Sequence, residues 1–222
     1  MKNVLIIAPH MDDEVLGCGG IIAKHKDSGD NVSVIFVAHR VYNHRFNEQR
    51  NNTEKSHAIN AKGVLCYDDA IFLDLNDERL DTCIQDILIP LEEYIFKVKP
   101  DIIYCPFRGD NSQDHRAVFD ATRVAARPSA AIFVKRLYMY EVPSSTEQSP
   151  PLQENAFLPN YYVNITKHID KKIEAYGCYE TEKRHYPHPR SEEAIKILAQ
   201  KRGIESGFEY AEAFMMLRGK WQ

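Results

Sequence analysis

Short apolar runs rich in β-branched residues alternate with helix-forming stretches through the first two thirds of this 222-residue chain. The expected strands are 4–8, 32–38, 70–73 and 101–105, and the expected helices are 14–26, 46–62, 82–98 and 113–126. Continuously apolar strands are typical of a parallel sheet that helices cover on both faces. The pattern therefore predicts an α/β fold with a Rossmann-like, doubly wound, mostly parallel sheet.

The last third of the chain follows a different pattern. Strands are expected at 136–142, 161–165 and 210–217, helices at 167–183 and 191–206, and a Ser/Pro-rich loop at 143–151. No polar linker separates these elements from the rest. We therefore expect one domain over 1–222, in which 1–127 form the Rossmann-like core. Residues 128–222 are expected to form an α+β extension of that domain, and this extension walls the substrate pocket.

Charge and cysteine content limit the class of protein. The net charge is −4, from 28 basic and 32 acidic residues, which predicts no nucleic-acid partner. The five cysteines form no C-x-x-C pair, which fits a reducing compartment and predicts a cytoplasmic location. No apolar stretch reaches the length of a membrane span.

The segment after the first expected strand carries the strongest chemical signal. It reads His10-Met11-Asp12-Asp13-Glu14 and lies where open α/β sheets place their sites. Two neighbouring carboxylates are costly to bury without a cation or a shared proton. A metal ion bound by the imidazole and one carboxylate, with the other carboxylate as a base, would explain the pattern. A solvated acidic loop is the alternative.

His115 is the third candidate ligand. It lies early in the helix after the fourth expected strand, so it can approach the end of the first strand. Three protein ligands with an open coordination position are typical of a catalytic zinc site. In isolation, His115 could equally be a surface residue of its helix.

These motifs resemble the PIG-L/LmbE-like zinc-dependent N-deacetylases of the N-acetylglucosaminyl deacetylase type. That family has a His-Pro-Asp-Asp-Glu-like element after its first strand and a His-x-Asp-His run later, where this chain has Ser112-Gln113-Asp114-His115. Further similar runs are Glu54-x-x-x-Ala58, Tyr140-Glu141-Val142-Pro143, Pro187-His188-Pro189-Arg190-Ser191, Arg202-Gly203 and Tyr210-Ala211-Glu212-Ala213-Phe214. The resemblance spans nearly the whole chain.

The resemblance implies roles for the residues of both motifs. His10, Asp13 and His115 match the zinc ligands, and Asp12 matches the general base. It implies one Zn²⁺ per chain, although Fe²⁺ or Mn²⁺ could occupy the same ligands. The implied reaction is hydrolysis of the acetamide of a small N-acetylated amino sugar or sugar conjugate, and the implied assembly is a possible homo-oligomer.

Two positions depart from the family pattern. Met11 replaces the usual proline, and Ser112 replaces a histidine that is thought to stabilise the oxyanion. Loss of one such donor weakens transition-state stabilisation by about 3–4 kcal/mol. Either activity is reduced or another group acts instead, and His188 in its proline-flanked loop is the candidate catalytic replacement. A surface turn is the alternative for His188.

Candidate substrate-binding residues come next. Arg190 can clamp an anion or bind sugar hydroxyls, or pair with a carboxylate such as Glu212. Asp110 caps the His115 helix, supports His115 or contacts substrate, and Ser112 lies in the same loop. Tyr140 either stacks on a sugar or lies in the core.

Two other functions remain possible from the sequence. Because of Ser112, the chain could be a metal-binding, catalytically weak protein that binds a sugar or nucleotide. A Rossmann oxidoreductase or methyltransferase fits the sheet pattern, but the first loop lacks the glycine fingerprint that such proteins need.

Overall fold

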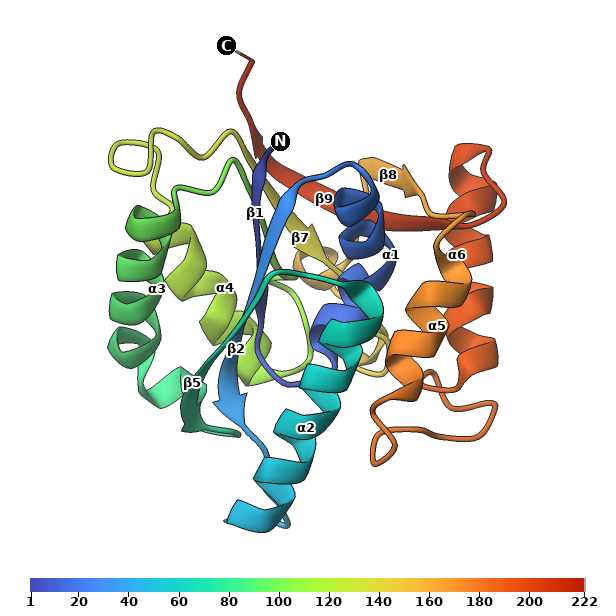
Figure 1. Cartoon of the computed structure of the whole chain (residues 1–222), viewed down its shortest axis with the longest axis horizontal. Helices are drawn as coiled ribbons and strands as arrows, with labels where there is room; N and C mark the ends of the chain where they lie inside the picture. Colours follow the sequence, from blue (N-terminus) through green and yellow to red (C-terminus); the bar gives the residue numbers. More distant parts are fainter. Residues whose placement is uncertain (222) are drawn as a thin grey trace.

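The computed structural model describes residues 1–221 and contains one seven-stranded sheet between two layers of helices (Figure 1). The sheet order is β5-β2-β1-β6-β7-β9-β8. Its strands are β1 (Asn3–Ala8), β2 (Asn31–His39), β5 (Asp69–Asn76), β6 (Ile102–Pro106), β7 (Arg136–Tyr140), β8 (Tyr161–Asn164) and β9 (Ala211–Gly219). The pairs from β5 through β7 are parallel, whereas β9 runs antiparallel to both β7 and β8. The expected mostly parallel α/β fold is confirmed.

Alternate side chains of the central strand enter opposite cores. Val4 and Ile6 pack into one hydrophobic cluster with α1, α2, α5 and α6, whereas Leu5 and Ile7 pack into the other with α3 and α4. The helices are α1 (Asp13–Asp27), α2 (Glu48–Leu65), α3 (Ile84–Val98), α4 (Gln113–Ala125), α5 (Ile169–Gly177) and α6 (Glu192–Ser206). Burial on both faces explains why the central strands β1 and β6 are continuously apolar.

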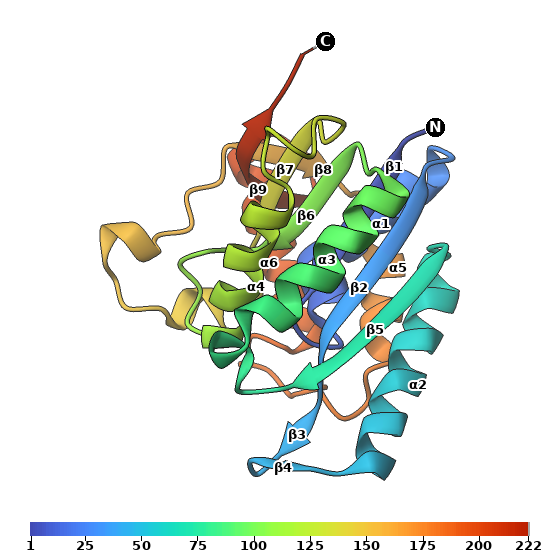
Figure 2. The same cartoon turned by 90° about the vertical axis from the view of Figure 1, so that its left-hand side faces the viewer.

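Some boundaries differ from those expected. A small hairpin, β3 (Val41–Tyr42) with β4 (Arg45–Phe46), follows β2 and lies beyond the end of the sheet (Figure 2). Helix α3 runs through Pro90 without a break, because its apolar stripe is held in the core. Helix α5 ends at Gly177 instead of near 183, so that a long loop leads into α6. Short 3₁₀ turns occur at Leu80–Thr82, Thr146–Gln148 and Gln153–Asn155.

The last third of the chain extends the same sheet and also contacts α1. Glu212 of β9 accepts hydrogen bonds from the backbone N–H groups of Gly20 and Ile21 at 2.8 and 2.7 Å. The Lys172 ammonium of α5 donates to Glu212 and to the Leu16 carbonyl at 2.7 and 2.8 Å. These contacts fix the C-terminal elements against the helix that begins at the predicted site.

None of the helices in the described part of the chain has the length and apolar character that spanning a lipid bilayer requires.

Candidate metal centre and active site

His10, Asp13 and His115 meet at the carboxyl ends of β1 and β6. His10 follows β1, Asp13 begins α1, and His115 lies in the first turn of α4. Asp13 Oδ2 lies 3.2 Å from His10 Nδ1 and 3.3 Å from His115 Nε2. All three side chains are buried, and one ligand atom from each lies within 4.8 Å of the other two. The structure thus brings the three sequence-predicted ligands together.

The donor atoms of this cluster fit a divalent metal. Two imidazole nitrogens and a carboxylate oxygen are the set that zinc and iron accept. The second oxygen of Asp13, Oδ1, is buried and has no hydrogen-bond partner among the described residues, so it is available as a ligand. Burial would raise the pKa of Asp13, but the adjacent His115 and His10 hold it well below its usual range. Asp13 is therefore ionised, as a metal ligand must be.

Carboxylates lie behind both imidazoles. His10 Nε2 is 3.0 Å from Asp77 and 3.1 Å from Asp114, and His115 Nδ1 is 3.2 Å from Asp110. A carboxylate on the outer nitrogen orients a metal-binding histidine and increases its basicity. The inner nitrogens, His10 Nδ1 and His115 Nε2, then face the position between the three ligands.

His10, Asp77 and Asp114 also form a group with metal-ligand spacing. Backbone groups already engage both carboxylates: Asp114 accepts from the N–H of Glu78 and Leu80, and Asp77 accepts from the N–H of Val41. We therefore interpret this group as support for the His10 ring. Asp77 was missed in the sequence because no motif surrounds it, whereas Asp114 belongs to a recognised motif and could have been assigned.

A depression of about 1050 Å³ lies beside this centre. His10, Asp77, Ser112 and Asp114 line it, together with side chains from the β3–β4 hairpin. The hairpin, which the sequence did not predict, thus borders the approach to His10.

Asp12 is fully buried and contacts Arg190. Its Oδ2 accepts from Arg190 Nη1 at 2.9 Å, and its Oδ1 is buried with no hydrogen-bond partner among the described residues. Burial raises the pKa of Asp12 to about 6, against the opposing effect of Arg190 and Arg40. A carboxylate with such a pKa is mostly ionised at neutral pH but accepts a proton readily, which is what a general base requires.

Arg190 is held in place by several groups. Its Nη1 also donates to Glu182 at 2.9 Å, and its Nε donates to Ser144 Oγ at 2.6 Å. Arg40 Nη2 lies 2.9 Å from the other oxygen of Glu182. The alternative pairing of Arg190 with Glu212 is wrong, because Glu212 pairs with Lys172. Arg40, Glu182 and Ser144 carried no sequence signal, since their link to Asp12 exists only in the folded chain.

The other predicted site residues occupy different positions. Ser112 is the N-cap of α4, and its hydroxyl accepts a long hydrogen bond of 3.4 Å from the His115 N–H. His188 is half-buried, and its Nδ1 accepts from the Arg190 N–H at 3.0 Å. Ser112 thus borders the depression, and His188 supports the loop that carries Arg190.

Two substrate-binding predictions need correction. Tyr140 is fully buried, and its hydroxyl donates to the Ile7 carbonyl at 2.8 Å, so it is a core residue without a face for a sugar. Asp110 is 1% exposed and accepts from Ser112 N–H and Thr146 Oγ1 behind His115. Asp110 therefore lies where it can support His115, which is the alternative role considered for it. It does not lie where a substrate could contact it.

Comparisons with known proteins bear on this geometry. The profile of the family "PIG-L: GlcNAc-PI de-N-acetylase" matches residues 5–126. The "Uncharacterized deacetylase YaiS" of Escherichia coli (strain K12) is 29% identical over 149 residues, which cover 65% of this chain and 76% of that protein.

Solved structures share the fold across nearly the whole chain. The N,N'-diacetylchitobiose deacetylase of Pyrococcus horikoshii has a TM-score of 0.74 at 20% identity and covers 98% of this chain and 84% of its own. GalB, the 4-carboxy-2-hydroxymuconate hydratase of Pseudomonas putida KT2440, has a TM-score of 0.78 at 20% identity. The match covers 100% of this chain and 98% of the GalB chain. Because a deacetylase and a hydratase both share it, the fold alone does not specify the reaction.

Proposed function

Because the chain belongs to the PIG-L family of de-N-acetylases, we propose that it is a zinc-dependent hydrolase that removes acetyl from an N-acetylated amino sugar or sugar conjugate. Family membership supports a deacetylase that acts on an amide. The observation that carries the proposal is the buried group His10, Asp13 and His115, with the Asp12 carboxylate beside it. The identity of the metal as zinc and the class of substrate as an N-acetylated amino sugar go beyond family membership and are part of the proposal.

In this proposal His10 Nδ1, Asp13 and His115 Nε2 hold the metal. A bound Zn²⁺ acts as a Lewis acid and makes water available as a nucleophile at neutral pH. Asp77, Asp114 and Asp110 orient the two imidazoles through their outer nitrogens. The same carboxylates keep each ring in the tautomer that presents its inner nitrogen to the metal.

Asp12 is the proposed general base. Its unpartnered Oδ1 accepts the proton of the attacking water, and the carboxyl group then delivers that proton to the nitrogen of the leaving amine. One water is consumed, the amide C–N bond breaks, and acetate and a free amine are released. Arg190 holds the other oxygen of Asp12 and thereby fixes the orientation of the base.

Ser112 is the observation that favours the alternative function. Its hydroxyl caps α4. A serine also provides no imidazole at the position where the family usually has a histidine. If neither His188 nor Arg190 compensates for that loss, the chain would bind metal and a sugar or nucleotide with little turnover.

Acetate release from a panel of N-acetyl sugars and their conjugates, with zinc-reconstituted protein, tests the proposal. Asp12→Asn keeps the shape of the side chain but removes the base, so we expect turnover to fall by about 10²–10⁴-fold while bound zinc is unchanged. Chelation should also abolish turnover in the wild-type protein.

The two functions predict different results in this experiment. Stoichiometric zinc without acetate from any substrate, together with thermal stabilisation by one of the sugars, would favour the binding protein. Equal acetate release by the wild type and Asp12→Asn would contradict the assignment of the base.

A further inference from the structure

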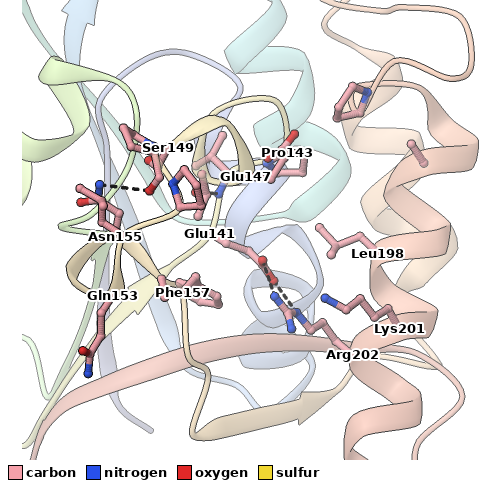
Figure 3. A pocket seen from close by; sticks show the side chains of 18 of the residues that line it. Glu141, Pro143, Glu147, Ser149, Gln153, Asn155, Phe157, Leu198, Lys201 and Arg202 are labelled. Atoms are coloured by element: carbon pink, nitrogen blue, oxygen red, sulfur yellow. Dashed lines mark hydrogen bonds and ion pairs between the residues drawn. The ribbon is translucent and has the colours of Figure 1, made fainter.

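A second cavity lies away from the metal ligands. Its volume is about 730 Å³, within the range of small-molecule sites, and it opens between the segment that follows β7 and helix α6 (Figure 3). None of His10, Asp12, Asp13 and His115 is among the residues that line it. The cavity is therefore separate from the proposed metal centre and from the general base.

The walls of this cavity are mostly apolar and rigid. Val142, Phe157 and Leu198 line it, together with several prolines from the segment after β7 and from the loop before α6. The Phe157 and Phe107 rings pack in a T-shaped arrangement, and the Arg202 guanidinium lies 5.6 Å from the centroid of the Phe157 ring. Proline backbones and a ring fixed on two sides lose little conformational freedom when a ligand binds. The wall is preformed for an apolar guest.

Three of the four charged side chains that line the cavity are in ion pairs. Arg202 donates to both carboxylate oxygens of Glu141 at 2.7 and 2.6 Å, and it also pairs with Glu205. Lys201 Nζ lies 3.8 Å from Glu205, and Glu147 accepts from the Ser144 N–H at 2.6 Å. The lining thus carries two acidic and two basic side chains, each with a partner. An anionic guest would lose hydration without gaining an unpaired cation. Glu147 accepts from a backbone N–H and is exposed to solvent, so an ion pair with it would contribute little to the binding of a cationic guest.

We propose that this cavity is an accessory binding site for a small, uncharged and largely apolar molecule. The volume sets the size of the ligand, and the apolar wall sets its polarity. The paired cations and the solvent-exposed Glu147 disfavour an ionic group. A ligand there would lie against residues next to those that support the active site: Pro143 precedes Ser144, which binds Arg190, and Thr146 donates to Asp110.

Fluorescence titration with N-phenyl-1-naphthylamine, an uncharged apolar fluorophore, tests the proposal on the full chain without any need for turnover. We expect saturable binding of one probe per chain. Leu198→Trp fills the cavity with an indole and should weaken binding by about tenfold or more. The matched control is Ile197→Trp on the outer face of α6, where the side chain is 51% exposed and outside the cavity, and its affinity should stay within about twofold of the wild type.

A second pair of variants tests the site independently in case Leu198→Trp does not fold. Leu152→Glu places a carboxylate in the exposed apolar wall and should also weaken binding, whereas Leu158→Glu, which lies outside the cavity, should not. Equal affinity in Leu152→Glu and Leu158→Glu would overturn the site.

The anionic analogue 1-anilinonaphthalene-8-sulfonate tests the charge of the ligand. It differs from the first probe by one sulfonate and should bind at least about tenfold more weakly, because no unpaired cation lines the described cavity. Tighter binding of the sulfonate at this cavity would overturn the assignment to an uncharged ligand.

Discussion

At the residue scale, neighbouring carboxylates in one loop have opposite surroundings. Asp12 adopts a φ of 121°, a strained conformation for a residue other than glycine. Asp13 Oδ2 accepts from the His10 N–H and lies between two imidazoles, whereas Asp12 contacts a guanidinium. Burial and charge accordingly move the two pKa values in opposite directions. One residue is suited to bind a cation and the other to exchange a proton.

His188→Ala tests whether the histidine next to this arrangement affects catalysis. Its Nδ1 accepts from the Arg190 N–H, so its loss should loosen the residue that holds Asp12. We expect turnover to fall about tenfold or more with zinc content unchanged. Steady-state acetate release and metal analysis are the measurements.

His185→Ala is the matched control, because His185 is exposed in the same loop. Its turnover should equal that of the wild type. Near-native turnover in His188→Ala would assign that histidine to the surface turn alone.

At the element scale, helix α1 depends on glycines for its position against the sheet and α5. A Cβ atom on Gly17 would lie 2.2 Å from the Tyr140 ring, and one on Gly20 would lie 2.7 Å from Ile165. Helix α1 begins at Asp13, so this close packing also sets the position of a proposed metal ligand. The glycines that follow the acidic motif thus permit a close approach of α1 to its neighbours.

Gly17→Ala should destabilise the protein by about 1–3 kcal/mol, because the added methyl group overpacks a buried ring. Gly63→Ala provides the comparison, since an added Cβ there meets no atom within 4 Å and Gly63 lies inside α2. That variant should be more stable than the wild type by about 0.5–1 kcal/mol.

Denaturant unfolding of both variants measures the difference. A Gly17→Ala protein as stable as the wild type would mean that α1 can shift away from Tyr140 without loss.

At the scale of the whole molecule, a buried ion pair joins the C-terminal extension to the Rossmann-like core. Lys172 of α5 and Glu212 of β9 are both about 5% exposed and contact each other at 2.7 Å. Each also binds the backbone of α1, so three distant segments meet at this pair. Because the extension supplies Arg190, this junction also positions a residue that contacts Asp12.

Lys172→Ala leaves the Glu212 carboxylate buried without its counter-charge and should lower the free energy of unfolding by about 3–5 kcal/mol. Glu174→Ala, an exposed position on the same helix, should change it by less than about 0.5 kcal/mol. Chemical denaturation followed by two spectroscopic probes would measure both.

The same experiment tests the prediction of a single domain over 1–222. Coincident transitions from both probes are expected for the wild type. Two separated transitions would show that residues 1–127 and 128–222 unfold independently.

Local patterns along the chain were enough to predict the strands and the metal ligands. Apolar runs with β-branched residues specified the parallel strands, and motifs at two strand ends indicated which ligands meet, because parallel strands bring their carboxyl ends to one edge. The boundaries that it missed, such as the hairpin after β2 and the early end of α5, depend on packing that no local periodicity records.

The pairing of distant side chains became visible in the folded chain alone. Arg190 reaches Asp12 across 178 positions, Asp77 supports His10, and Tyr140 is buried against a glycine of α1. The residue type alone does not specify the partner in any of these contacts. An arginine or a tyrosine can lie in an active site or in the core of a protein. The folded chain selects one partner through burial, because a buried charge or hydroxyl must be paired and only the packed structure determines which groups are within reach.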